Sequence, residues 1–303
     1  MTAGAAPEPG RRASLGAAAV LAGYLLLAPS LYLLGPLALL TLFSRPRTPR
    51  ELIWLGLASA GAAANLAGDQ TLVPQLLRTG GLLMSFGFAL LSLRGSPTVV
   101  SRLLWALALS VGGLILWAQV WGVTWVAVEN AFTAIFQELY KSWAASRPND
   151  LDFQRLLQQS PEMARQAARL MPGLLALQAM AGAALAWDWH LRIAATPLGR
   201  APARFKDFRF NDHLVWGAIF TLGLMLLPLP PLAGLIAANL LIVWAGLYTV
   251  RGLAVIAAVF EQAPALLRIP AMALASPICA VLGLADTWLD FRGRLIPPAP
   301  GGA

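Results

Sequence analysis

The sequence predicts an all-α protein, a polytopic transmembrane helical bundle with eight or nine membrane segments. Hydrophobic residues make up 58% of its 303 residues and charged residues only 12%, about half the charged share that is usual in soluble domains. Three long stretches carry no charged residue: 103–121, 213–231 and 232–250. An apolar run of about 18 or more residues can cross a hydrocarbon core roughly 30 Å thick as a helix. Since a helix that is apolar on every side must be surrounded by protein or lipid, we expect lipid to surround most of the chain.

The net charge of +8 does not by itself indicate a nucleic-acid partner. The arginines lie in short connectors between apolar stretches rather than on one face of a basic domain, and the positive-inside rule accounts for such a distribution. Two histidines and the single Cys279 are too few and too far apart to build a tetrahedral metal site. We therefore expect no metal, no cofactor and no nucleic-acid partner.

The distribution of polar residues divides the chain into five segments. The N-terminal residues are rich in Pro, Gly and Ala, and a polar stretch separates two groups of apolar helices. The predicted segments are a disordered N-terminus (1–12), N-terminal membrane helices (13–121), a polar amphipathic extramembrane segment (122–169), C-terminal membrane helices (170–294) and a disordered tail (295–303).

The first membrane helix is expected over Ala13–Ala28. Pro29 and the Gly35-Pro36 pair are expected to break the helix before a short second segment, Leu37–Phe43. This unit either crosses twice or crosses once with a re-entrant piece. Arginines stand on both sides of it, which favours two crossings with a cytoplasmic N-terminus; they are Arg11, Arg12, Arg45, Arg47 and Arg50.

Three longer helices are predicted next, over Glu51–Gly68, Val73–Leu93 and Leu103–Trp121. The first of them carries a ladder of small residues at a spacing of four: Gly56, Ala60, Ala64 and Gly68. Such a face lets helix backbones approach closely within lipid.

The polar segment begins with apolar and polar residues alternating at helical spacing from Trp125 onward, which predicts a helix that lies on the membrane or caps the bundle. Ser160 and Pro161 are expected as the N-cap and first residue of the next helix. The C-terminal part is then predicted to cross over Leu170–Leu191, His213–Leu227, Leu232–Phe260 (with a kink at Gly252) and Ile269–Asp286, with the arginine-rich loop Thr196–Asp212 in the cytoplasm.

The last third of the chain resembles a known family. Phe205, Phe208, Phe210 and Asp212 precede Leu214-Val215-Trp216; Asn239 lies in a long helix that runs into Arg251-Gly252-Leu253-Ala254-Val255; and the chain closes with Leu282-Gly283-Leu284-Ala285-Asp286-Thr287-Trp288-Leu289-Asp290-Phe291-Arg292. This pattern resembles the YybS-like family of bacterial membrane proteins, which often has Gln where Arg251 stands. The N-terminal half is similar to the substrate-binding subunits of energy-coupling-factor vitamin transporters. In those subunits, small residues on the first helix dock against a partner membrane subunit; Ala18/Ala22 and Ala19/Gly23 match them here.

Arg251 is the most informative ionisable residue, because it stands between two long apolar runs. Placing a charge at a helix centre costs on the order of 2.5–3.5 kcal/mol on insertion scales. An ion pair with Asp286 would relieve both desolvation costs, so we expect a structural clamp; ligand binding by Arg251 and Asp286, or snorkelling of Arg251 to the headgroups, are the alternatives. Asp290 shares a helix face with Asp286 and is expected to pair with Arg294 at the end of the helix.

Asn239 is the best single candidate for lining a solute pocket, although an interhelical hydrogen bond is the default role of a lone polar residue in an apolar helix. Trp187-Asp188-Trp189-His190 are interpreted as an interfacial aromatic belt rather than a proton relay, since Asp188 and His190 point about 200° apart on a helix. Asn211-Asp212 are interpreted as a helix N-cap.

No phosphate-binding glycine loop, nucleophile elbow or zinc-binding helix motif occurs in the sequence. We therefore expect no enzyme. The first hypothesis is a non-catalytic solute-binding or transporter-associated subunit of the bacterial inner membrane. Its expected partners are the bilayer, a small-molecule ligand and another membrane subunit. The alternative is a scaffold that recruits envelope or cytoplasmic machinery through the polar segment and the arginine-rich loop.

Overall fold

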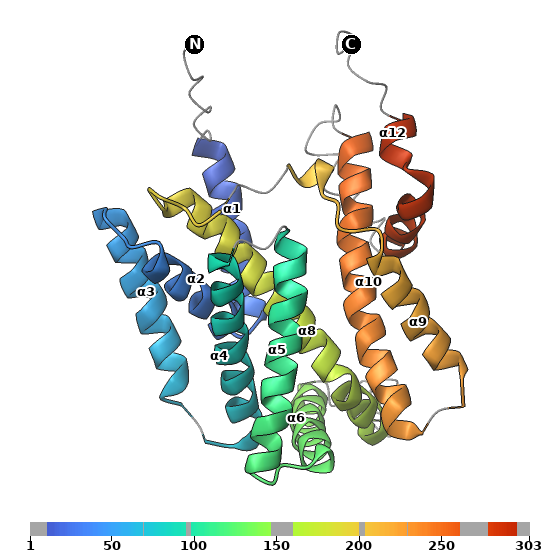
Figure 1. Ribbon diagram of the computed structural model, residues 1–303. Helices are drawn as coiled ribbons and strands as arrows, with labels where there is room; N and C mark the ends of the chain where they lie inside the picture. The colour runs from blue at the N-terminus through green and yellow to red at the C-terminus, as the bar shows by residue number, and fades with distance from the viewer. Residues whose placement is uncertain are drawn as a thin grey trace, which may run out of the picture. The chain divides into compact units, whose positions relative to one another are not determined.

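The computed structural model describes residues 11–68, 70–94, 98–146, 160–199, 204–228, 230–260 and 278–295. These residues form helices, and no strand occurs among them, so the predicted all-α membrane bundle is confirmed (Figure 1). Among the described residues, four helices are long and apolar enough to cross a membrane: α4 (Leu72–Leu93), α5 (Val99–Val120), α8 (Ser160–Ile193) and α10 (Pro231–Val259).

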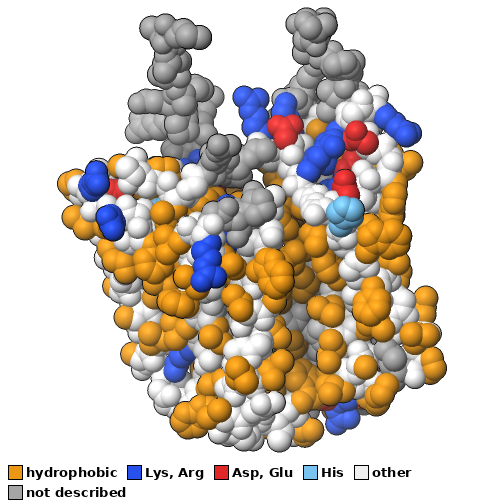
Figure 2. Space-filling view, viewed as in Figure 1, with side chains coloured by type: hydrophobic (Ala, Val, Ile, Leu, Met, Phe, Trp, Pro, Cys, Tyr) orange, Lys and Arg blue, Asp and Glu red, His pale blue; other side chains and the backbone are white. Residues whose placement is uncertain are grey.

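The chain divides into two compact units. Unit 1 comprises Met1–Thr124 and Gln178–Ala201, and unit 2 comprises Trp125–Leu177 and Pro202–Ala303. Helix α8 contributes residues to both. In each unit, hydrophobic side chains cover the sides of the helices, and most of the charged side chains gather toward helix ends (Figure 2). This distribution is the one expected of helices whose sides face lipid.

Unit 1 begins with two short helices, α1 (Arg11–Leu27) and α2 (Leu31–Phe43). The predicted break at Gly35-Pro36 is wrong, because Pro36 lies inside α2. The chain is interrupted earlier, around Pro29. Helix α2 is buried against α3 and α4, and this packing keeps the helix continuous despite the proline, as neighbouring helices do in membrane proteins.

Helix α3 (Pro49–Leu66) starts two residues before its predicted start because a capping box fixes its first turn. The Thr48 hydroxyl oxygen accepts a hydrogen bond from the Glu51 N–H at 3.3 Å, and the Glu51 carboxylate accepts one from the Thr48 N–H at 2.8 Å. Each side chain thereby satisfies a backbone donor that the start of a helix leaves free.

Helix α4 packs against both α2 and α5, and glycines permit these contacts (Figure 1). Gly81 lies against Leu31 of α2, and Gly87 lies against the backbone of Ala106 in α5. Small residues therefore occupy the helix–helix contacts of unit 1, as they do in membrane bundles generally.

The polar segment contributes α6 (Trp125–Ala145) to unit 2, with Val128 and Phe132 buried. The segment 147–159 lies outside the described residues. The crossing predicted to begin at Leu170 instead belongs to the single 34-residue helix α8, which begins at Ser160 and contains Pro172.

The C-terminal part contains the 3-10 turn η1 (Phe205–Asp207), α9 (Leu214–Leu226), α10, the helix Ile278–Leu289 and the short α12 (Phe291–Leu295). The first residue of the predicted tail, Leu295, is therefore the last residue of α12. Helix α10 runs through Gly252 as one continuous 29-residue helix, and the kink at Gly252 stays a prediction. The first part of the predicted final span, 269–277, lies outside the described residues.

Two glycines bring α10 and the helix Ile278–Leu289 into backbone contact. A Cβ atom at Gly283 would collide with the Tyr248 carbonyl oxygen and the Gly252 nitrogen, and a Cβ atom at Gly252 would collide with the backbone of Cys279. Gly252 therefore permits a close approach of two helices, and this approach sets Asp286 beside α10.

Gly283→Ala should lower the free energy of unfolding by about 1–3 kcal/mol, because the backbone atoms around it cannot move aside as a side chain would. Gly234→Ala is the matched control: Gly234 lies inside α10, no atom lies within 4 Å of its Cβ position, and alanine should add roughly 0.5–1 kcal/mol of helix stability. Chemical unfolding in detergent, followed by tryptophan fluorescence, measures both. Equal effects of the two substitutions would contradict the close approach.

Candidate functional site

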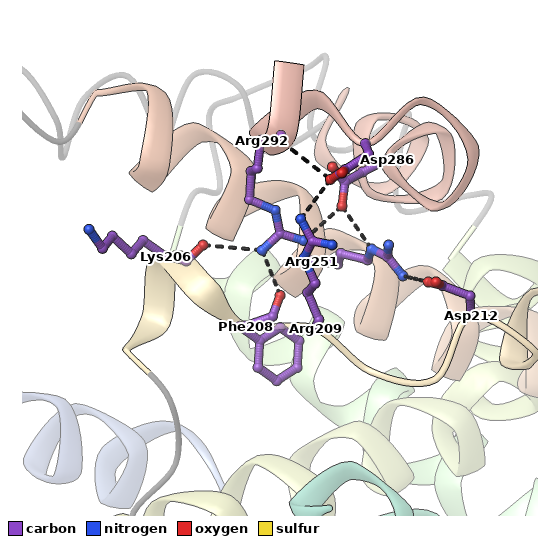
Figure 3. Close-up of polar contacts among 9 residues, drawn as sticks. Lys206, Phe208, Arg209, Asp212, Arg251, Asp286 and Arg292 are labelled. Carbon is purple, nitrogen blue, oxygen red and sulfur yellow. Dashed lines mark hydrogen bonds and ion pairs between the residues drawn. The ribbon is translucent and has the colours of Figure 1, made fainter. Parts of the chain in front are cut away.

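The predicted contact between Arg251 and Asp286 is present, and it lies in a larger ion-pair network of unit 2 (Figure 3). Arg251 comes from α10 and is 2% exposed. Its Nε donates to Asp286 Oδ2 at 3.0 Å, and its Nη1 donates to Asp212 Oδ1 at 2.7 Å. The guanidinium group therefore points at two carboxylates, not along the helix toward headgroups as snorkelling would require.

Arg292 of α12 holds the same aspartate from a third segment. Its Nη2 donates to Asp286 Oδ2 at 2.7 Å. Its Nη1 donates to the carbonyl oxygens of Lys206 and Phe208, at 3.1 and 2.9 Å. Arg292 thus ties the loop around η1 to the end of the chain.

We call Arg251, Asp286, Arg292 and Asp212 the Arg251 cluster. Its two guanidinium groups and two carboxylates balance in charge. Arg251, Asp286 and Arg292 are buried, whereas the Asp212 side chain is 65% exposed. Buried ions cost several kcal/mol each to desolvate and are tolerated only when paired and hydrogen-bonded. The arrangement meets that requirement for Arg251 by pairing it with two carboxylates.

Aromatic rings cover one side of the Arg251 cluster. The Phe210 ring centroid lies 5.3 Å from Arg251 Cζ, and Tyr248 packs edge-on against Phe210 at 5.2 Å. A guanidinium over an aromatic face gains electrostatic stabilisation, and more so where water is excluded. Phe210 therefore belongs to the site, although its spacing in the sequence did not predict this contact.

Asp212 and Asp290 differ from their predicted roles. The side chain of Asn211 accepts a hydrogen bond from the His213 N–H at 3.0 Å, while Asp212 turns to Arg251 instead of capping α9. Among the described ion pairs, Asp290 is paired with Arg209 at 2.6 Å rather than with Arg294. Asp290 has a φ of 40° and lies between two helices, so the i, i+4 geometry of a continuous helix does not apply to it.

Asn239 is held by the proline-containing part of α8. Its Oδ1 accepts from the Gly173 N–H at 2.6 Å, and its Nδ2 donates to the carbonyl oxygens of Arg169 and Leu235, each at 2.9 Å. Gly173 and Arg169 stand four residues apart, so they are the two groups that an uninterrupted helix bonds to each other. The amide of Asn239 bridges these groups next to Pro172, and both of its N–H donors are engaged within the protein.

The interpretation of Trp187-Asp188-Trp189-His190 as an interfacial belt is wrong for its rings. Trp187, Trp189 and His190 are buried within unit 1. Trp187 packs edge-on against Phe88, and Trp189 against Trp54. Asp188 points the other way, as predicted, and pairs with Arg192 at 2.8 Å. Both indoles are buried because they pack against α3 and α4. Helical spacing within α8 alone does not predict these contacts.

No group of three or more His, Cys, Asp or Glu side chains that could hold a metal ion occurs among the described residues. Among the described residues, the Arg251 cluster is the site that links the most ion pairs.

Apolar helices with buried ion pairs define the chain as a multi-helix membrane protein. The family model "Predicted membrane protein (DUF2232)" matches residues 16–287, and the chain belongs to this family. The match is consistent with the YybS-like resemblance. No curated protein and no solved structure matches the sequence significantly. The similarity to energy-coupling-factor subunits stays a prediction.

Arg251→Ala should lower the free energy of unfolding by about 3–5 kcal/mol, because it leaves Asp286 buried with one partner fewer. Adding Asp286→Ala should cost less than the sum of the two single effects, since the second substitution removes a charge that the first left underpaired. Arg209→Ala is the control: it breaks the exposed pair with Asp290 and should cost only about 0–1 kcal/mol. Strict additivity in this unfolding cycle would remove the clamp from the explanation.

Asn239→Leu should destabilise the protein by about 1–3 kcal/mol, because it leaves the Gly173 N–H and the Arg169 carbonyl without their side-chain partner. Thr249→Val is the control on the same helix: the Thr249 hydroxyl is exposed and donates only to the Ala245 carbonyl of its own helix. That substitution should stay within about 0.5 kcal/mol. Thermal unfolding in detergent compares the two, and a loss at position 239 no larger than at 249 would contradict the bridging role.

Proposed function

We propose that this membrane protein is a non-catalytic subunit of a membrane assembly, associated with a transporter of the bacterial inner membrane. The observation that carries the proposal is the small-residue face of α3, formed by Gly56, Ala60 and Ala64. All three residues are exposed, and no atom lies within 4 Å of a Cβ position at Gly56. Small residues favour helix–helix contact within lipid, yet this face is exposed and contacts no helix in the described part of unit 1.

The opposite face of α3 is the one that packs within unit 1. Ala58 is 1% exposed, Trp54 packs against Trp189, and Gly61 lies against Leu34 of α2. The small-residue face is therefore directed away from the unit's own helices.

A comparison with α5 distinguishes a docking face from a lipid face. The exposed side of α5 carries large residues, among them Leu109, Val111, Ile115 and Leu116. Inside unit 1, by contrast, Gly81 and Gly87 of α4 form the helix contacts. The exposed side of α3 carries Leu52, Ile53 and Leu57 as well, but its Gly56, Ala60 and Ala64 repeat the small-residue composition of the contacts inside unit 1. The proposed occupant of this small-residue face is a transmembrane helix of a partner subunit.

Helix α1 supports the same proposal. Ala18, Ala19 and Ala22 are exposed, and no atom lies within 4 Å of a Cβ position at Gly23. These are the residues whose spacing is similar to the docking helix of energy-coupling-factor subunits. The arginines at both ends of the α1–α2 pair favour a cytoplasmic N-terminus.

The candidate ligand residues favour a structural role over solute binding. Arg251 and Asp286 are paired with each other, and both N–H donors of Asn239 are used. The scaffold alternative gains less support, because two charged residues in the described part of the arginine-rich loop are engaged within unit 2. Arg209 pairs with Asp290, and Asp212 pairs with Arg251.

A photo-crosslinking amino acid at position 60 should form a discrete covalent product with one partner membrane protein in native membranes. The same group at position 111, on the exposed face of α5, should react only with lipid. Ala64→Leu should abolish the product from position 60, because a large side chain separates the helices, whereas Leu116→Phe should not. The proposal fails if position 60 gives only lipid adducts or if the crosslinked partner is a second copy of this chain.

A further inference from the structure

Arg102 is a buried cation at the arginine-rich end of unit 1, where α2 and α4 end and α3 and α5 begin. It lies in the first turns of α5 and is 6% exposed. Its Cζ atom lies 4.2 Å above the Trp187 ring, and its Nη1 donates to the Ser92 hydroxyl oxygen over a long 3.4 Å. Stacking on the indole fixes the plane of the guanidinium group and leaves its edge available as a hydrogen-bonding fork.

Arg102 has no carboxylate partner in the described part of unit 1. The described carboxylates there are Glu51 and Asp188, and both are engaged elsewhere. Glu51 accepts hydrogen bonds from the N–H groups of Arg47, Thr48 and Ala195 and from the Thr48 hydroxyl. Asp188 pairs with Arg192. In unit 2, by contrast, Arg251 is paired with two carboxylates. Within the described residues of unit 1, Arg102 therefore remains a positive charge without a carboxylate counter-charge.

The polar atoms without partners beside Arg102 are all hydrogen-bond donors. They are Arg102 Nε, Trp187 Nε1 and His190 Nδ1. The Leu198 N–H donates to His190 Nε2 at 3.4 Å, so the proton of the neutral imidazole is on Nδ1. Trp187 neighbours both of the other residues: Arg102 Cζ lies 4.2 Å from its ring centroid, and the His190 ring centroid lies 6.2 Å from it. Trp187 is 1% exposed and His190 0%, so bulk water does not satisfy these donors.

The unpartnered polar atoms near the Arg251 cluster differ from the three donors near Arg102, because they include hydrogen-bond acceptors. Among them are the acceptor Asp286 Oδ1 and the hydroxyls of Tyr248 and Thr287, which can exchange hydrogen bonds with one another after small rotations. Donors alone cannot do so. A buried set of donors around an unneutralised guanidinium needs an acceptor that also carries negative charge.

We propose that Arg102, Trp187 and His190 form a binding site for a phosphate-type oxyanion, supplied either by free phosphate or by the headgroup of an anionic phospholipid. A phosphate group presents several acceptor oxygens and matches the planar fork of arginine. A water molecule could accept two of the hydrogen bonds but would leave the charge of Arg102 in place. The exposed arginines at this end of unit 1 attract anions toward the site; they are Arg45, Arg47, Arg50 and Arg94. Figure 2 shows Lys and Arg side chains gathered there.

The test is thermal unfolding of the full-length protein, purified in an uncharged detergent without phosphate. Inorganic phosphate should raise the Tm by about 5 °C at a hundredfold excess over its Kd, relative to sodium chloride at equal ionic strength. In a second arm, nanodiscs containing phosphatidylglycerol are compared with pure phosphatidylcholine. A shift in the first arm identifies free phosphate as the source, and a shift in the second arm alone identifies the lipid headgroup.

Arg102→Met should abolish the shift and should not lower the Tm in phosphate-free buffer, because it removes a buried charge that has no counter-charge. Arg94→Gln, an exposed arginine at the same end, is the matched control and should keep the full shift. Trp187→Phe keeps the aromatic ring but removes one donor, and should weaken the apparent affinity about tenfold.

The proposal is overturned if neither arm shows a shift, or if the Arg102→Met protein responds as the wild type does. Should Arg102→Met fail to fold, the Trp187→Phe protein decides, since an unchanged affinity there would also refute the site.

Discussion

The Asp286 carboxylate connects three separate parts of unit 2. It is buried, and two arginines reach its Oδ2 atom: Arg251 from α10 and Arg292 from α12. Through these arginines it is linked to Asp212 before α9 and to the carbonyl groups of the η1 loop. Since a buried charge is tolerated only when paired, the helices must stay in the register that keeps these contacts. Gly252 and Gly283 make that register sterically possible.

The same constraint shapes polar side chains throughout the fold. In hydrocarbon, a backbone group without a partner costs several kcal/mol, so side chains take over where helix geometry fails. Asn239 supplies a donor and an acceptor next to Pro172, and Glu51 satisfies the first turn of α3 together with the Ala195 N–H at the end of α8. Arg102 differs, because it is a buried cation without a carboxylate partner in the described part of unit 1. The missing counter-charge supports the proposed anion site at Arg102, whereas the paired polar groups elsewhere stabilise the fold.

Part of the candidate site could be predicted from the sequence. Arg251 stands out because it interrupts a long uncharged stretch, and the cost of burying it requires a carboxylate partner, for which Asp286 was the candidate. Asp212 and Arg292 were not predicted as partners. Asp212 lies in the segment before α9, where no periodicity specifies direction. Arg292 lies in the short helix α12, and the φ of 40° at Asp290 turns the chain so that Arg292 can reach Asp286. Pro36 is the opposite case: its local rule predicted a break, and packing against α3 and α4 overrode it.

The sequence by itself determined the solvent, the helical class and the approximate bounds of most helices, because hydrophobicity and helix periodicity are properties of consecutive residues. Only the tertiary structure decided which helix faces are buried, which carboxylate neutralises which arginine, and which buried cation in the described part of unit 1 has no carboxylate partner. Those outcomes depend on distances between residues far apart in the chain. The desolvation cost of a buried charge can be inferred from the sequence, but only the fold places a counter-charge beside it.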